Sequence, residues 1–469
     1  MKKIIRLSMV SVLALASLQA SEVSKDADNL EDMFANGKVS GQIREFSISR
    51  HVRDNRPGKK EYTRDANAIG GYLKFETADY KGLSFGTAFY TTNGFALADP
   101  KSDNTAVDPS LLGKNNESYS MLGEAYVEYK VDKTAIKIGR QKFSTAMMGA
   151  DDARMLPNLF EAYTLTNKDI NGLDIQVAHV NKFAQGTFGR VYGSGGLLGS
   201  TAGYSAWDAS NQVGEFKNMG EYAVGKKTDG VTNVQLKYKI ENFNIKISND
   251  YAWDLYNTLY ADAGISWKCL LSDSVKSFFK AQVIKQNSTG DEYMKNIDTI
   301  AGTSATSDGD IDSLYWAVKA GAKVNGLTAY VSYSETTDND ASDVTNGNAY
   351  ANAIITQFGG MPAYTQGMVT RHQFLAGTKA TKVAASYSFK EHGLNLSAAA
   401  YYASFDMDEN SGYGKERTAY EPGFDIKYYP SMVKNLQLRF RGNFPRNFYE
   451  DSTGSVGWNE YRFIANYNF

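Results

Sequence analysis

The sequence predicts an all-β fold: a transmembrane antiparallel β-barrel of about 18 strands with short periplasmic turns, long extracellular loops and an inward-folded third loop. Three observations predict it. Short segments alternate between apolar and polar residues, their connections alternate between tight turns and long polar loops, and the chain is polar overall (mean hydropathy −0.42) although it contains 31 Tyr and 24 Phe. Each strand of such a barrel faces lipid on one side and water on the other.

The chain begins with a segment typical of exported proteins. Basic residues in the first six positions precede an apolar stretch, residues 7–18, that is too short to span a bilayer. We predict a signal peptide at 1–20, a periplasmic N-terminal segment at 21–37 and the barrel at 38–469. Within the second segment, Leu30 and Phe34 lie at helical spacing, which favours a short helix, with a disordered leader as the alternative.

The alternating segments give the strands. In the last one, Tyr461, Phe463 and Ala465 share one face, while Arg462 and Asn466 share the other, because successive side chains of a strand point to opposite faces. The apolar set must face outward, since an Arg turned into lipid costs roughly 2–4 kcal/mol near the midplane. The segments begin near Lys38, Asn67, Leu83, Ser118, Thr134, Phe160, Leu173, Val231, Phe243, Asn257, Val275, Ser313, Leu327, Ala380, Leu394, Thr418, Leu436 and Trp458.

The connections between these segments alternate in length. The tight turns are residues 79–82, 131–133, 241–242, 324–326 and 391–393, and the long polar loops are residues 51–66, 93–117, 183–230, 285–312, 335–379 and 406–417. Short periplasmic turns and long extracellular loops are the two ends of an outer-membrane barrel. A soluble β-sandwich or repeat protein, the alternative fold, does not predict this alternation.

The residues that face inward by parity are unbalanced in charge. Thirteen are basic and seven acidic, although the whole chain has a net charge of −2. The predicted pore-lining bases are Arg44, Lys74, Lys237, Lys239, Lys246, Lys280, Lys319, Lys323, Lys382, Lys427, Arg439, Arg441 and Arg462. A basic lumen would draw a carboxylate along successive cations. The alternative is that these charges only keep the interior wet.

The connection at residues 142–158 differs from an ordinary surface loop. It combines apolar residues such as Met147 and Met148 with Asp151, Asp152 and Arg154. An exposed loop gains nothing from methionine, so we expect this one to fold into the barrel and place both carboxylates and Arg154 in the lumen, at the constriction. There the carboxylates would attract the ammonium group of an amino-acid-like solute. An outer loop with a stray salt bridge is the alternative.

A family resemblance rests on the same region. Gly139-Arg140-Gln141, followed by Asp152-Ala153-Arg154-Met155-Leu156-Pro157 and Phe160, is similar to the constriction-loop pattern of the OprD-type substrate-specific porins. The resemblance implies an eighteen-stranded barrel, an inward third loop and a basic ladder for carboxylates. The final Tyr467-Asn468-Phe469 resembles the signal that the outer-membrane assembly machinery reads.

These observations predict a porin in the outer membrane of a Gram-negative bacterium, which passes small charged solutes (amino acids, carboxylates and ions) by passive diffusion. The expected partners are membrane lipid, lipopolysaccharide, those solutes and the β-barrel assembly machinery through Phe469, with a homotrimer left open. We expect no enzyme activity, cofactor, metal site or nucleic-acid partner, because the four histidines are scattered and Cys269 stands alone. A non-conducting surface adhesin and, behind it, an outer-membrane hydrolase are the alternatives.

Overall fold

The computed structural model describes residues 26–95, 107–192, 196–204, 213–269, 272–290, 311–345, 350–412, 415–450 and 452–469. The predicted signal peptide, residues 1–20, lies outside the described residues. No helix among the described residues is long and apolar enough to cross a membrane.

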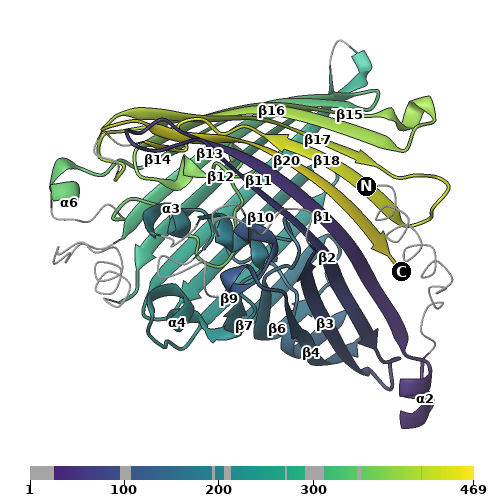
Figure 1. Ribbon diagram of the computed structural model, residues 1–469. Coiled ribbons are helices and arrows are strands. Elements are labelled where there is room, and N and C mark those ends of the chain that lie inside the picture. The colour runs from purple at the N-terminus through teal and green to yellow at the C-terminus, as the bar shows by residue number, and fades with distance from the viewer. Residues whose placement is uncertain are drawn as a thin grey trace.

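Eighteen long strands form a closed antiparallel barrel, which confirms the predicted fold class (Figure 1). They are β1 (Lys38–Asp54), β2 (Tyr62–Glu76), β3 (Leu83–Gly94), β4 (Tyr119–Val131), β5 (Thr134–Gln141), β6 (Leu159–Asn167), β7 (Leu173–Ala184), β9 (Val231–Ile240), β10 (Phe243–Ala252), β11 (Tyr256–Cys269), β12 (Ser272–Ser288), β13 (Asp312–Val324), β14 (Leu327–Thr336), β15 (Thr378–Ser388), β16 (Leu396–Met407), β17 (Arg417–Tyr428), β18 (Leu436–Asn443) and β20 (Ser455–Asn468).

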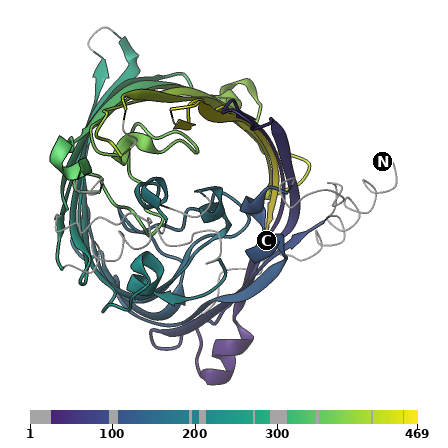
Figure 2. The same cartoon turned by 60° about the vertical axis from the view of Figure 1, so that its left-hand side comes forward.

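The remaining elements are short and lie in the connections or before the first strand. They are β8 (Lys217–Asn218), β19 (Tyr449–Glu450), α2 (Leu30–Ala35), α3 (Gly196–Thr201), α4 (Met219–Val224), α6 (Ala341–Thr345) and the 3₁₀ turns η1 (Pro109–Leu111), η2 (Lys114–Asn116), η3 (Thr187–Tyr192), η4 (His372–Phe374) and η5 (Phe389–His392). Helix α2 falls inside the segment where we expected a helix. It lies outside the barrel wall (Figure 2), where the Phe34 ring stacks on Phe85 at a centroid distance of 6.5 Å.

The barrel closes where its first and last strands pair. Strand β1 is hydrogen-bonded to both β2 and β20, and Arg44 stands opposite Asn466. The Gly41 amide donates to the Phe469 carbonyl at 2.9 Å, and the Phe469 amide donates back to Gly41 at 3.1 Å. No strand edge is left open along this seam, which Figure 1 shows as the purple strand beside the yellow one.

The tight turns gather at one end of the barrel and the long loops at the other. Between β13 and β14, Asn325 and Gly326 have φ of 44° and 79°. Positive φ at both central residues matches the twist of a two-residue hairpin, and Asn-Gly adopts it at little cost. Large apolar side chains such as Phe89, Val331 and Phe463 are exposed on the outer wall, as the alternation predicted.

Several loops bury side chains inside the barrel, among them the second, whose Leu111 packs with Phe46 and Met155. Three of them carry the candidate site. Counted along the end that carries the long loops, they are the third (residues 142–158), the fourth (185–230) and the seventh (337–377), and Figure 2 shows chain inside the ring of strands. The inward third loop was predicted. The fourth and seventh were expected to be surface loops, and that expectation is wrong because both bury apolar side chains: Tyr222 and Phe358 pack with Met148 and Phe183 in one core.

Candidate solute path through the barrel

Asp152 fixes the third loop to the barrel wall. Its carboxylate accepts from Arg44 Nη1 at 2.7 Å and from Lys142 Nζ at 3.1 Å. Arg44 also donates to the backbone carbonyl of Arg154. Burial alone would raise the pKa of Asp152, but the charges of Arg44 and Lys142 outweigh it and hold that pKa below its usual value. Asp152 therefore anchors the loop as a carboxylate.

Arg154, which we expected in the lumen, lies in a buried charge cluster and lines none of the three cavities described below. Its Nη2 donates to Glu460 Oε1 of β20 at 2.9 Å, and both side chains are fully buried. Glu460 also pairs with Arg50 at 2.8 Å and Arg462 at 3.1 Å, and Arg50 pairs with Asp108 at 3.2 Å. Burial and the repulsion of Arg462 lower the pKa of Arg154 to about 10, so the side chain keeps its charge at neutral pH. The cluster joins the third loop to two wall strands.

Asp151 connects the three inward loops. Its carboxylate accepts from the Tyr204 hydroxyl of the fourth loop at 2.6 Å and from Arg371 Nη1 of the seventh loop at 3.2 Å. The Phe188 ring lies between two guanidinium groups, with its centroid 4.9 Å from Arg154 Cζ and 4.6 Å from Arg371 Cζ. Burial would lower the pKa of Arg371, but Tyr192 and Asp151 hold it above its ordinary value.

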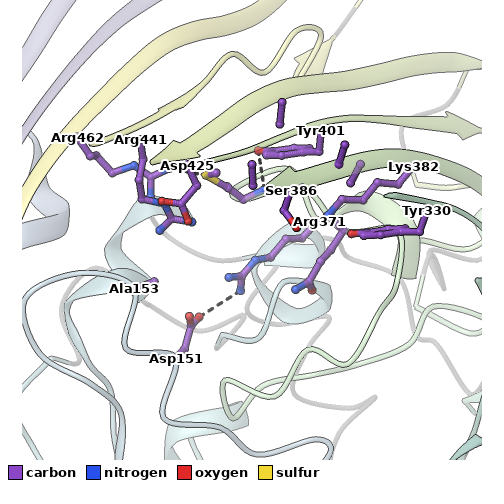
Figure 3. Close-up of a pocket in the computed structure, with 17 residues that line it drawn as sticks. Asp151, Ala153, Tyr330, Arg371, Lys382, Ser386, Tyr401, Asp425, Arg441 and Arg462 are labelled. Atoms are coloured by element: carbon purple, nitrogen blue, oxygen red, sulfur yellow. Dashed lines mark hydrogen bonds and ion pairs between the residues drawn. The ribbon is translucent and has the colours of Figure 1, made fainter. Parts of the chain in front are cut away.

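A cavity of about 480 Å³ lies between these loops and the wall (Figure 3). We call it the central cavity. Its charged lining comes from opposite sides, with Asp151 on the third loop and Arg441 and Arg462 on the wall. The lining residues are Asp151, Ala153, Tyr330, Gln366, Gly367, Met368, Arg371, Lys382, Ala384, Ala385, Ser386, Ala399, Ala400, Tyr401, Asp425, Arg441 and Arg462.

The central cavity carries four bases and two acids, and both acids are already paired. Asp425 accepts from Arg439 Nε at 2.7 Å and lies 3.7 Å from Arg441 Nε. Lys382 Nζ donates to the Gln366 carbonyl at 2.7 Å, which leaves its charge without a carboxylate partner among the described residues. The cavity can therefore receive an anionic group, since Arg and Lys bind carboxylates through charge-assisted hydrogen bonds.

Glu421 does not line the central cavity, and its carboxylate holds the seventh loop. Its carboxylate accepts from the backbone amides of Met368 and Thr370, each at 2.7 Å, and from the Tyr401 hydroxyl. The Tyr401 ring in turn lies 4.8 Å from Lys382 Nζ. Glu421 thus fixes both a loop and an aromatic side of the cavity.

The structure divides the thirteen predicted pore-lining bases among several places. Lys382, Arg441 and Arg462 line the central cavity, Lys280, Lys319 and Lys323 line a second cavity of about 380 Å³, and Lys237, Lys239 and Lys246 line a third of about 500 Å³. Four line none of these: Arg44 binds the third loop, Lys74 pairs with Glu76 and Glu124, Arg439 binds Asp425, and Lys427 stands opposite Arg439.

Sequence reasoning missed Arg371, Tyr401, Glu460 and Lys276. Arg371 lies in the seventh loop, for which we expected a position on the surface. The apolar run Ala353-Ile354-Ile355 of this loop could have indicated that it folds inward, as the methionines did for the third loop. Lys276 has the inward parity of Lys280, four residues on, and could have been found. For Tyr401 and Glu460, the sequence indicates only which face of the strand they occupy, and nothing in it points to their role. Among the described residues, no group of three or more His, Cys, Asp or Glu side chains could hold a metal ion.

Comparisons with known proteins agree with this architecture. A family model described as outer membrane porin, OprD family, matches residues 31–469. Porin D of Pseudomonas aeruginosa is 22% identical over 483 residues, covering 97% of this chain and 98% of its own length. The solved structure of OccK9 (OpdG) from Pseudomonas aeruginosa superimposes with a TM-score of 0.70 at 16% identity, covering 93% of this chain and 100% of its own.

Two further solved structures are similar. OpdK of Pseudomonas aeruginosa, in a structure with vanillate, gives a TM-score of 0.69 at 13% identity. A BenF-like porin from Pseudomonas fluorescens Pf-5 gives 0.69 at 15% identity. Each match covers 93% of this chain and 99% of the other.

Proposed function

The chain belongs to the OprD family of outer membrane porins, and we propose that its channel selects small solutes that carry a carboxylate. As a family member it is a channel for small solutes in a Gram-negative outer membrane and not an enzyme. This confirms the porin and localisation predictions and argues against the hydrolase alternative.

The observation that carries the proposal is the charge of the central cavity. Four bases, Arg371, Lys382, Arg441 and Arg462, face a space of about 480 Å³ that only two acids line. Asp151 pairs with Arg371, and Asp425 pairs with Arg439 and Arg441, so positive charge remains in excess. A volume of this size is in the range of small-molecule sites. The vanillate in the OpdK structure is an aromatic monocarboxylate, which adds support from a family member of low identity.

Zwitterions such as amino acids fit the same cavity. Asp151 stands across the central cavity from Arg441 and Arg462 (Figure 3). A solute whose carboxylate meets the wall would therefore bring its ammonium group toward Asp151. We infer that amino-acid-like solutes are accepted, with the third loop as the constriction, and that this transverse field orients them.

The test is Arg441→Gln combined with Lys382→Gln in planar bilayers. Both side chains line the central cavity, and glutamine keeps them polar. We expect reversal potentials to move toward cation selectivity and the benzoate concentration for half-maximal block to rise about tenfold, the loss of roughly 1.4 kcal/mol of ionic binding. The matched control is Lys133→Gln with Lys434→Gln, since both lysines are exposed at tight turns. Equal shifts in both double variants would overturn the proposal.

We also propose that Phe469 is the assembly signal. The residue directly follows β20, the strand that closes the barrel, and its backbone is hydrogen-bonded to Gly41. Phe469→Ala should reduce the amount of heat-modifiable barrel in cells but leave refolding in detergent unchanged. A loss in both would assign Phe469 to barrel stability instead.

A further inference from the structure

The second cavity is lined by lysines that do not line the central cavity. It lies at the tight-turn end of the barrel, beside the β9–β10 turn residue Asn242, and four lysines line it: Lys276 and Lys280 of β12, and Lys319 and Lys323 of β13. We call it the lysine cavity. Among the residues that the structure describes, no carboxylate lines it and no ion pair engages any of these four ammonium groups.

The register of the strands places like charges directly opposite one another. Lys276 pairs with Lys323 and Lys280 with Lys319, while Lys268 of β11 pairs with Lys276 from the other side. Directly opposed side chains have Cβ atoms about 4.5–5.5 Å apart, and like charges in such pairs are destabilising. A bound anion would offset this repulsion, as it would for the opposed Arg441 and Arg462 of the central cavity.

The walls of the lysine cavity are shaped as well as charged. Gly264 lines the cavity, and a Cβ at this position would meet Asn244 Oδ1 at 2.9 Å and Lys280 Cγ at 3.2 Å. Any other residue at this position would therefore crowd the polar groups of the cavity wall. The space of about 380 Å³ is bounded by ammonium groups, two side-chain amides and two aromatic rings.

The lysine cavity lies beside the central cavity. Tyr330 lines both. The Lys319 ammonium lies between two rings, 4.6 Å from the centroid of Tyr330 and 4.3 Å from that of Tyr364, which restricts its motion. The nearby Asp262 accepts from the Tyr364 hydroxyl and lines the third cavity with Lys246. A solute leaving the central cavity toward the tight turns therefore meets the four lysines next.

We propose that the lysine cavity is a second binding site, at the periplasmic exit, for multiply charged oxyanions such as phosphorylated or polycarboxylate solutes. A single carboxylate would offset one of four ammonium charges, whereas a group with two or more negative charges bridges opposed lysines. This proposal depends on the protein being a porin of this family, but it does not depend on the carboxylate selectivity of the central cavity.

The test measures block of ion current by pyrophosphate and by citrate added from the tight-turn side, with acetate as the singly charged reference. For Lys276→Gln with Lys323→Gln, we expect the half-blocking pyrophosphate or citrate concentration to rise at least about tenfold and that of acetate less than about twofold, because Coulomb attraction scales with the charge of the anion. The control is again Lys133→Gln with Lys434→Gln, which should change neither. Block by either polyanion supports the site, and the ratio between the two identifies the preferred class.

A second readout does not depend on current. Pyrophosphate should raise the temperature at which gel mobility shifts in the wild type and not in the variant, because a ligand stabilises the state that binds it. Without the anion, the variant should be at least as stable as the wild type, since the opposed charges are gone. Equal block and equal stabilisation in wild type and variant would overturn the proposal. Arg441→Gln should raise the half-blocking concentration of pyrophosphate less than Lys276→Gln with Lys323→Gln does, so a failure of the lysine cavity can be distinguished from a failure of the central cavity.

Discussion

Replacing Glu460 by Gln should release the third loop from the wall. The buried charge cluster contains three arginines, Arg50, Arg154 and Arg462, and two carboxylates, Glu460 and Asp108. Removing the Glu460 charge leaves three buried guanidinium groups with one carboxylate. Breaking a buried ion pair from one side costs about 3–5 kcal/mol. At about 1.4 kcal/mol for each factor of ten, a loss near 4 kcal/mol lowers the ratio of anchored to released loop roughly a thousandfold.

Arg154→Met removes the other end of the same ion pair and serves as the comparison. It leaves two arginines with two carboxylates, so the cluster becomes balanced, and the methionine can lie against Phe188 as the guanidinium does. We expect a loss of only about 1–2 kcal/mol, mainly from hydrogen bonds to buried partners. The charge balance therefore predicts that Glu460→Gln is the more severe change.

Single-channel recording is the assay, together with the size limit for neutral polyethylene glycols, which does not depend on pore charge. Glu460→Gln should give larger, noisier openings and admit larger polymers, and Arg154→Met a smaller change in the same direction. An acid at a tight turn, Glu391→Gln, is the control. A normal size limit in Glu460→Gln, or a larger effect of Arg154→Met, would refute the reasoning.

Three further predictions follow from the inward loops. Asp151→Asn should weaken block by arginine more than block by acetate. Asn tolerates the φ of 35° at this position, and its carbonyl oxygen can still accept from Tyr204 and Arg371, so the contacts between the loops are kept although the ion pair is lost. Deleting residues 146–153 should raise conductance. Deleting residues 187–192 should raise it too, because the fourth loop packs on the third. Unchanged conductance in both deletion variants would contradict the packing of these loops on one another. Burial and nearby Arg417 lower the pKa of His372 to about 3 from 6.5, so only the unfolded side chain takes a proton between these values. Its stabilising contribution is present above pH 6.5 and falls by about 1.4 kcal/mol per pH unit toward pH 3, and His372→Gln should flatten the drop in gel-shift temperature between pH 7 and pH 4.5.

The sequence predicted the wall of the barrel closely because alternation is a local property. The starts of β5, β7, β9, β10, β14 and β18 match the predicted residues. The largest error is in β2, which begins at Tyr62 and was expected near Asn67. Its first residues pair with Arg50 and His51 of β1. Both strands are polar there, so the alternation of apolar and polar residues stops although the hydrogen bonds between the strands continue.

The interior could be predicted only in part, because its contacts join distant parts of the chain. The methionines of the third loop indicated that it folds inward. Nothing local indicated that Arg154 would meet Glu460, which lies 306 positions away. The bias toward basic residues was visible, but parity cannot separate a base that faces a cavity, such as Lys382, from one that holds a loop, such as Arg44.

The seam between β1 and β20 also sets the order in which the molecule can form. Strands such as β9 and β10 join neighbours in sequence, so these hairpins can form early, whereas Gln42 pairs with Asn468 only after every other strand is in place. Contacts of such long sequence separation form slowly. Until they do, two long strands present unpaired edges to any other chain. Aggregation through these unpaired edges is therefore the main hazard of biogenesis. The hazard ends when β1 pairs with β20, for example where Arg44 stands opposite Asn466.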